Sequence, residues 1–143
     1  MSDPYNLQRF VDAQRDTFET ALAELRAGRK QTHWMWFIFP QLAGLASSST
    51  ARYYAISSVA EARAYLEHPL IGPRLLACID AILPWAGTRS ADEILGPVDA
   101  LKLRSSLTLF DRVEPQRSFA EALAGFYRGE PDERTLALLN AQQ

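Results

Sequence analysis

Cysteine and histidine are scarce in this chain of 143 residues, which contains one cysteine, Cys78, and two histidines, His33 and His68. A single cysteine excludes an intramolecular disulfide and a cysteine-based zinc site. Neither histidine has a second ligand at a metal-binding spacing, so we expect no metal. Cys78 lies in an apolar stretch and is expected to be a buried core residue rather than a reactive thiol.

The chain also lacks an excess of basic charge and a long apolar run. It carries 15 lysines and arginines against 17 acids, a net charge of −2. A protein that binds nucleic acid through counterion release needs a basic face, so we expect no nucleic-acid partner. The longest apolar run, residues 34–39, is far shorter than the roughly 20 residues of a membrane span. Residues 1–20 are charged throughout and resemble no signal peptide, so we expect no membrane partner and a cytoplasmic location.

Glycine does not form a phosphate-binding loop. Gly44, Gly72, Gly87 and Gly96 lie too far apart for either nucleotide fingerprint, and we expect no cofactor. The apolar content of 48% and charged content of 22% are those of an ordinary globular protein. Length and composition predict a single globular domain over residues 1–143, and they predict no particular oligomeric state.

Helical periodicity is the main signal in the rest of the chain. Apolar residues in 5–27 recur at spacings of three, four and seven, after a start at Asp3-Pro4 and before a stop at Gly28. Three serines stand three residues before a glutamate, the pattern of a capping box, at Ser58, Ser90 and Ser118. The predicted helices cover residues 5–27, 58–67, 70–83, 90–96, 118–129 and a last one from 131.

Residues 101–109 fit two patterns. Leucines at 101, 103, 107 and 109 fit an alternating strand, whereas Ala100, Leu103, Leu107 and Phe110 fit a helix with Asp99 as its N-cap. We favour the helix, because nothing else in the chain offers a partner strand and an isolated hairpin is marginal in water. The fold class expected is all-α, with about six to seven short helices packed orthogonally rather than up and down.

The most unusual feature is the aromatic segment 33–41, whose run of apolar residues is too short to show a period. One interpretation makes Trp36, Phe37 and Phe39 core anchors, since aromatic side chains bury the largest area. The other makes the segment a pocket wall, in which the Trp34 ring stacks on a planar ligand.

Polar residues beside this segment favour an anionic ligand. Lys30 and His33 precede Trp34, and His33 has a pKa range suited to a general acid or base. Further along, Lys102, Ser105 and Ser106 share one helix face and could hold a phosphate or carboxylate. These three residues could equally well form a solvent-exposed helix face that binds no ligand.

The order of motifs along the chain resembles an uncharacterised bacterial and fungal family, domain of unknown function 1810, sometimes labelled calpastatin-like. The motifs are His33-Trp34-Met35-Trp36-Phe37-Ile38-Phe39-Pro40-Gln41 and residues 44–45, 51–56, 64–69, 72–75, 102–110, 126–129 and 135–139. The resemblance implies a compact all-α domain and no established activity. Calpastatin is unstructured, so that label does not suit this globular chain. Leu107 stands where the family often has methionine, a swap that conserves volume.

From these residues we expect a small intracellular ligand-binding protein, or a hydrolase, acting on a nucleotide-derived or other phosphate-bearing molecule such as a relative of ADP-ribose. His33 is the candidate acid or base. The candidate ligand-binding residues are Lys30, Trp34, Gln41, Tyr53, Lys102, Ser105 and Ser106. The alternative is a non-enzymatic protein-interaction module that uses an exposed aromatic patch.

Overall fold

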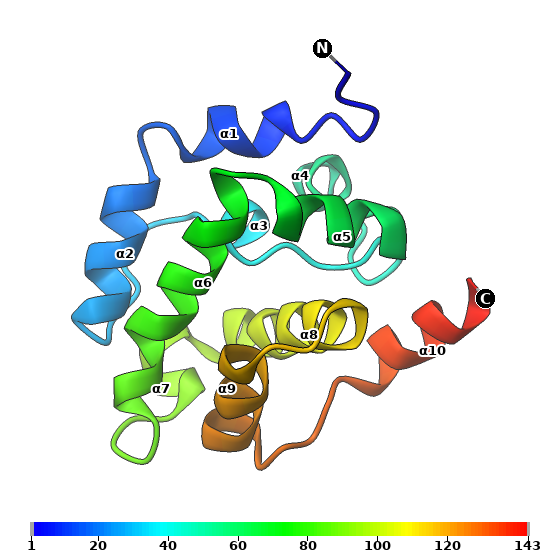
Figure 1. Ribbon diagram of the computed structural model, residues 1–143. Coiled ribbons are helices and arrows are strands. Elements are labelled where there is room, and N and C mark those ends of the chain that lie inside the picture. The colour runs from blue at the N-terminus through cyan, green and yellow to red at the C-terminus, as the bar shows by residue number, and fades with distance from the viewer. Residues whose placement is uncertain (1, 143) are drawn as a thin grey trace.

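The computed structural model describes residues 2–142, and in that range it consists of ten α-helices and one short 3₁₀ helix (Figure 1). The elements are α1 (Gln8–Gln14), α2 (Phe18–Arg26), α3 (Met35–Ile38), α4 (Ser49–Tyr53), α5 (Val59–Glu67), α6 (Ile71–Ile82), η1 (Leu83–Trp85), α7 (Ala91–Leu95), α8 (Pro97–Val113), α9 (Arg117–Tyr127) and α10 (Glu133–Ala141). The predicted all-α class is confirmed. In Figure 1, α1, α5 and α8 lie across the direction of α2, α6 and α9.

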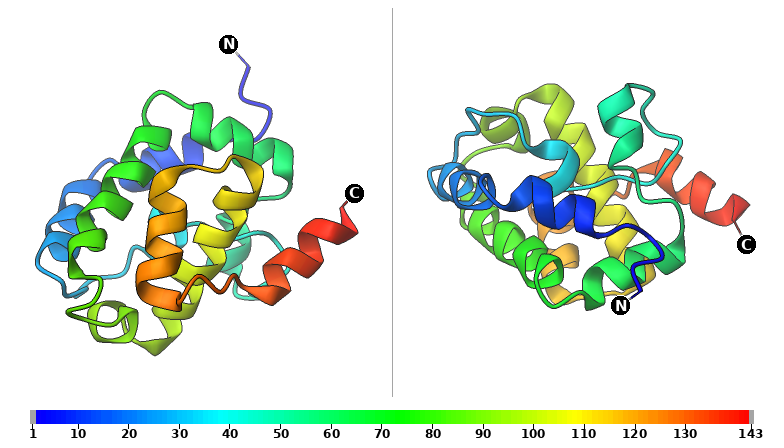
Figure 2. Two further views of the ribbon diagram at one scale, coloured as in Figure 1. Left: turned by 60° about the horizontal axis from the view of Figure 1, so that its bottom comes forward. Right: turned by 90° about the horizontal axis from the view of Figure 1, so that it is seen from above.

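The predicted number of helices, six to seven, is wrong. The expected helix over 5–27 is two helices, because the chain turns at residues 15–17; α1 then packs on α3, and α2 packs on α6 (Figure 2). Two further single-turn helices, α3 and α4, form where no period was visible. The first helix begins at Gln8, later than predicted, and Asp3 holds the turn before it: its carboxylate accepts from the backbone N–H groups of Leu7 and Gln8 at 2.8 and 3.0 Å.

Residues 101–109 are helical and lie inside α8, the longest helix of the described chain. Its N-cap is Gly96, not Asp99, and Pro97 occupies the first helical position. Proline suits that position because its missing N–H would have no partner there. Asp99 therefore lies in the first turn of α8, where its side chain is free to meet other groups. The single β-type contact between described residues is an isolated bridge of Leu42 with Ile56.

The predicted capping boxes differ in outcome. Ser90 and Glu93 form the complete reciprocal box at the start of α7. Ser58 accepts from the Glu61 N–H, but the Glu61 carboxylate bonds elsewhere, so only half of that box exists. The third prediction is wrong: α9 begins before Ser118, whose hydroxyl donates to a side chain of α6.

The core contains a row of aromatic rings that links four helices. Phe10 of α1 meets Tyr65 of α5 edge-on at 5.0 Å, Tyr65 lies 5.4 Å from Phe110 of α8, and Phe110 stacks on Phe119 of α9 at 6.2 Å between ring centres. All four rings are fully buried. Cys78 is also buried, as predicted, and burial raises the pKa of its thiol to about 12.

A buried arginine joins the start of the chain to the segment between α4 and α5. The Arg9 guanidinium donates to the Tyr53 and Ala55 carbonyl oxygens at 2.8 and 3.0 Å. It also forms an ion pair with Glu61 at 2.7 Å, and both side chains are more than 90% buried. Residues 53–55 are thereby fixed in place, and two of them, Tyr54 and Ala55, line the site described below.

Candidate functional site

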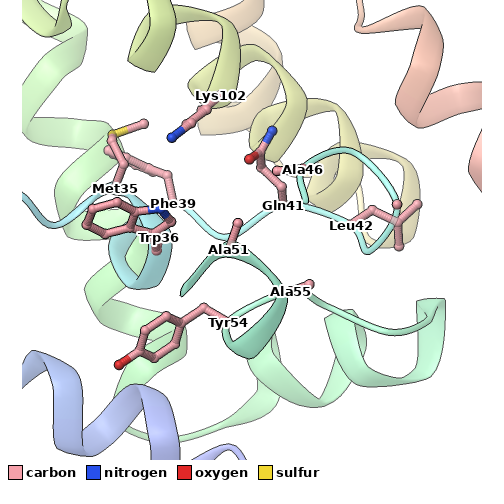
Figure 3. A pocket seen from close by; sticks show the side chains of 11 residues that line it. Met35, Trp36, Phe39, Gln41, Leu42, Ala46, Ala51, Tyr54, Ala55 and Lys102 are labelled. Atoms are coloured by element: carbon pink, nitrogen blue, oxygen red, sulfur yellow. The ribbon is translucent and has the colours of Figure 1, made fainter. Parts of the chain in front are cut away.

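A small cavity lies between α3, the segment that follows it, α4 and α8 (Figure 3). Its volume is about 20 Å³, which is room for about one water molecule. Its lining residues are Met35, Trp36, Phe39, Gln41, Leu42, Gly44, Ala46, Ala51, Tyr54, Ala55 and Lys102. Lys102 is the one charged residue among them.

Two polar side chains point into the same space from different elements. Figure 3 shows the Lys102 and Gln41 side chains at one side of the cavity, with the Lys102 ammonium directed toward the Trp36 ring. The Lys102 Nζ lies 5.5 Å from the centre of the Trp36 ring, within range of a cation–π interaction. Lys102 and Gln41, which are 61 positions apart in the sequence, thus line the same cavity.

Asp99 links this cavity to Lys30. The carboxylate lies 3.0 Å from the Lys30 Nζ and 3.7 Å from the Lys102 Nζ. The chain contains thirteen arginines but only these two lysines, and both reach the same carboxylate. Two ammonium groups against one carboxylate leave a local charge of +1 in an acidic protein. Lys30 is the tighter and more deeply buried partner, with 8% of its side chain exposed against 24% for Lys102.

The two tryptophans of segment 33–41 exchange the roles predicted for them. Trp34 is fully buried in the core, and its ring faces Phe39 at 6.2 Å and the Lys30 ammonium at 5.0 Å. Trp36 is only half-buried and borders the cavity. The prediction of Phe39 as a core anchor is confirmed, whereas Phe37 is partly buried and packs on the edge of the core.

Glu24 of α2 holds Trp34 and the loop before it. Its carboxylate accepts from the backbone N–H groups of Gln31 and Thr32 at 2.8 and 3.1 Å, and from the Thr32 hydroxyl at 2.7 Å. It also accepts from the Trp34 indole N–H at 2.9 Å. Burial works to raise the pKa of Glu24, but these hydrogen bonds outweigh it and the pKa lies below its ordinary value of 4.5.

The hydrogen bonds of Glu24 predict a pH-dependent contribution to stability. A carboxyl group whose pKa is lower in the folded than in the unfolded chain stabilises the fold above its unfolded pKa. That contribution is lost as the pH falls through the folded pKa. We therefore expect Glu24→Gln to be less stable than the unmodified chain at pH 7, with the difference shrinking as the pH falls below about 4. Urea denaturation of both proteins from pH 7 to pH 3 measures it, and a difference that stays constant over this range would contradict the assignment.

Six of the predicted site residues do not line the cavity: Lys30 and Trp34, described above, and the four that follow. His33 is exposed on the loop before α3, and Tyr53 is 56% exposed, with its ring edge-on to Tyr54. The Ser105 hydroxyl is turned back along α8, donating to the Leu101 carbonyl at 3.1 Å. Ser106 is 1% exposed, and its hydroxyl has no hydrogen-bond partner among the described residues.

Two residues that contribute to this site, Asp99 and Tyr54, were not among the site residues predicted from the sequence. Asp99 was considered only as a helix cap, and no local pattern shows that Lys30, 69 residues away, reaches it. Tyr54, not its neighbour Tyr53, borders the cavity. Burial, followed by the nearby Tyr53, raises the pKa of Tyr54, so its hydroxyl stays neutral at physiological pH. Adjacent tyrosines can be distinguished only by which one the backbone turns inward.

The chemistry of the lining is simple. None of the described residues that border the cavity is a histidine, a carboxylate, a serine or a cysteine. Within residues 2–142, no group of three or more His, Cys, Asp and Glu side chains is placed to hold a metal ion. No helix in that range is both long and apolar enough to cross a membrane. The arrangement offers one cation, one amide and aromatic surface.

Comparison with known proteins gives a family and a fold. Residues 4–139 match the family described as "Protein of unknown function (DUF1810)". The structure is similar to the crystal structure of the conserved hypothetical protein Rv1873 from Mycobacterium tuberculosis, with a TM-score of 0.93 and 52% sequence identity. The match covers 96% of this chain and 99% of that one. No curated protein matches. The family resemblance inferred from the motifs is confirmed.

Proposed function

This chain belongs to the family described as "Protein of unknown function (DUF1810)", and we propose from its cavity that it binds a small anionic ligand, with a phosphate group as the preferred anion. The observation that carries the proposal is the meeting of both lysines of the chain at Asp99, one of them directed into the cavity beside Gln41. Lysine is a compact point charge on a flexible stem and a common phosphate ligand.

Asp99 would act as a counter-ion that the ligand displaces. The 3.7 Å separation of Lys102 from Asp99 is longer than a direct hydrogen bond, so Lys102 has donors to spare. Lys30 lies closer, at 3.0 Å, and keeps Asp99 neutralised when Lys102 turns to an incoming anion. The Gln41 amide would donate a second hydrogen bond to the same anion.

The size of the cavity limits what enters it. About 20 Å³ is room for about one water molecule, so the enclosed part suits a single oxygen of the anion and no aromatic ring. The remainder of a phosphate-bearing molecule would lie on the half-exposed ring of Trp36. A planar base or sugar can stack there, as the sequence suggested for the other tryptophan, Trp34.

Binding is better supported than hydrolysis. A hydrolase needs a group within hydrogen-bond reach of the reacting atoms that can take or give a proton. The lining provides Lys102 and the neutral Tyr54 hydroxyl but no histidine or carboxylate, and His33 lies outside it. A protein-interaction module built on the aromatic segment is also less well supported, because Trp34 is fully buried and Trp36 half-buried.

The two lysines make the test direct. Lysine-selective isotope labelling gives two sets of side-chain NMR signals, which Lys102→Gln assigns. Inorganic phosphate, ADP and ADP-ribose are titrated in turn. We expect saturable shifts of the Lys102 signal and a rise in melting temperature. Lys102→Gln is expected to weaken binding by about ten-fold or more, the loss of a hydrogen bond to a charged group.

Arg29→Gln is the matched control, because it removes an exposed cation next to Lys30 without touching the cavity. It should leave the affinity unchanged within about two-fold. No saturable shift with any of the three compounds would refute the proposal. Equal binding by the unmodified chain and Lys102→Gln would refute it as well.

A further inference from the structure

A second, larger groove lies on a different side of α8, where its C-terminal end meets α5 and α10. Its volume is about 410 Å³, within the range of pockets that hold small molecules. The lining residues are Val59, Arg63, Arg112, Val113, Leu136, Leu139 and Asn140. It shares no lining residue with the Trp36–Lys102 cavity. Figures 1 and 2 show α10 standing out from the body of the molecule, and α10 supplies Leu136, Leu139 and Asn140 to the lining of the groove.

The groove carries two arginines without partners. Arg63 of α5 and Arg112 of α8 form no ion pair and no side-chain hydrogen bond within residues 2–142. The adjacent acid, Asp111, is half-buried, and burial raises its pKa. It borders a neighbouring hollow rather than this groove. Arg63 and Arg112 thus both line a groove whose lining contains no carboxylate, and Arg112 also borders the neighbouring hollow, where its charge works to lower the pKa of Asp111.

The remaining walls are mainly aliphatic. Val59, Val113, Leu136 and Leu139 come from three different helices and are half-buried or buried. Branched aliphatic side chains of this kind suit an alkyl chain, which needs area to bury and no specific polar contact. The Asn140 amide stands among them as a neutral donor and acceptor.

We infer that this groove binds a single-chain anionic amphiphile, a carboxylate on a flexible alkyl chain. Arg63 and Arg112 would hold the carboxylate, since the planar guanidinium matches a carboxylate with two parallel hydrogen bonds. The four aliphatic side chains would cover the first part of the alkyl chain. The inference concerns a separate site and stands whether or not the Trp36–Lys102 cavity binds phosphate.

A protein partner fits this groove less well. A stable protein interface needs an apolar area that extends beyond a single pocket. The large apolar side chains that are exposed in the described chain are Tyr53, Leu70, Val98 and Leu101, and none of them lines the groove. The apolar surface here is confined to the groove itself, as expected for a small ligand.

The experiment is a titration with decanoate, below its micelle concentration, followed by the methyl NMR signals of Val59, Val113, Leu136 and Leu139. We expect saturable shifts at these methyl groups. Decanol, which lacks the charge, and acetate, which lacks the chain, should each bind at least about ten-fold more weakly. Arg63→Gln and Arg112→Gln should each weaken decanoate binding by about ten-fold.

Arg26→Gln is the control, because Arg26 is an exposed arginine at the end of α2 and lies outside the groove. Its affinity for decanoate should match that of the unmodified chain. Both groove variants replace exposed side chains, so their folding is expected to be intact. The inference is overturned if decanoate causes no saturable shift at the four residues, if decanol binds as tightly, or if the Arg63→Gln/Arg112→Gln double variant binds decanoate normally.

Discussion

Replacing Trp34 with alanine is expected to lower the free energy of unfolding by about 3–5 kcal/mol, whereas Trp36→Ala should cost about 1 kcal/mol. Trp34 is fully buried, so alanine leaves a large cavity and removes the indole N–H that donates to Glu24. Trp36 is half-buried and is not part of the main core cluster. Its truncation removes little buried area.

The measurement is urea denaturation followed by far-ultraviolet circular dichroism, which does not depend on the fluorescence of the replaced ring. Trp34→Phe is the intermediate variant, because phenylalanine fills most of the space but cannot donate to Glu24. Trp36→Ala should remain folded and lose affinity for the anionic ligand, if the proposed cavity is the binding site. A larger stability cost for Trp36→Ala than for Trp34→Ala would contradict the assignment of the two rings.

The exchanged roles of these tryptophans show where sequence reasoning about the site ends. Both lie in one short apolar run, and α3 is a single helical turn, so no periodicity distinguishes an inward from an outward ring. Trp34 precedes the helix in a conformation that is neither helical nor extended (φ −147°, ψ 4°), and its indole N–H donates to Glu24 of α2. That partner is ten residues away on another helix. A tertiary contact therefore decides which tryptophan is buried, and no local sequence pattern shows it.

The fold was more predictable than the site, for a physical reason. Caps and apolar spacing are local signals, and they located α7 and the stop at Gly28, whereas for α8 the spacing fitted both a strand and a helix and the predicted cap was wrong. The turn between α1 and α2 has no proline or glycine to mark it. It forms because the two halves pack on different neighbours, and because Gln14 at the end of α1 donates to the Phe37 carbonyl at 2.8 Å. Tertiary packing, rather than a local sequence signal, therefore decides where the helix predicted over 5–27 is interrupted.

Arg9→Met is expected to lower the free energy of unfolding by about 3–5 kcal/mol, the usual cost of leaving one partner of a buried ion pair without the other. All five N–H donors of Arg9 are used, on the carbonyl oxygens of Tyr5, Asn6, Tyr53 and Ala55 and on the Glu61 carboxylate. Methionine fills part of the volume and donates to none of them. Arg15→Met is the control: Arg15 pairs with Asp12 on the surface, where an ion pair contributes about 0–1 kcal/mol.

A second substitution separates the charge from the packing. In the unmodified chain, Glu61→Gln removes a charge that Arg9 requires, so it should destabilise the fold. In the Arg9→Met background the Glu61 carboxylate is buried without its cation, and Glu61→Gln should then raise stability, since a neutral amide costs less to bury. Urea midpoints of the four proteins complete this double-mutant cycle. A Glu61→Gln effect of the same sign in both backgrounds would refute the account.

Because Arg9 also fixes residues 53–55, any Arg9→Met protein that remains folded should bind the anionic ligand more weakly. Arg9 is remote from Lys102 in sequence and is not among the residues that line the cavity, so this effect would be transmitted through the backbone of residues 53–55.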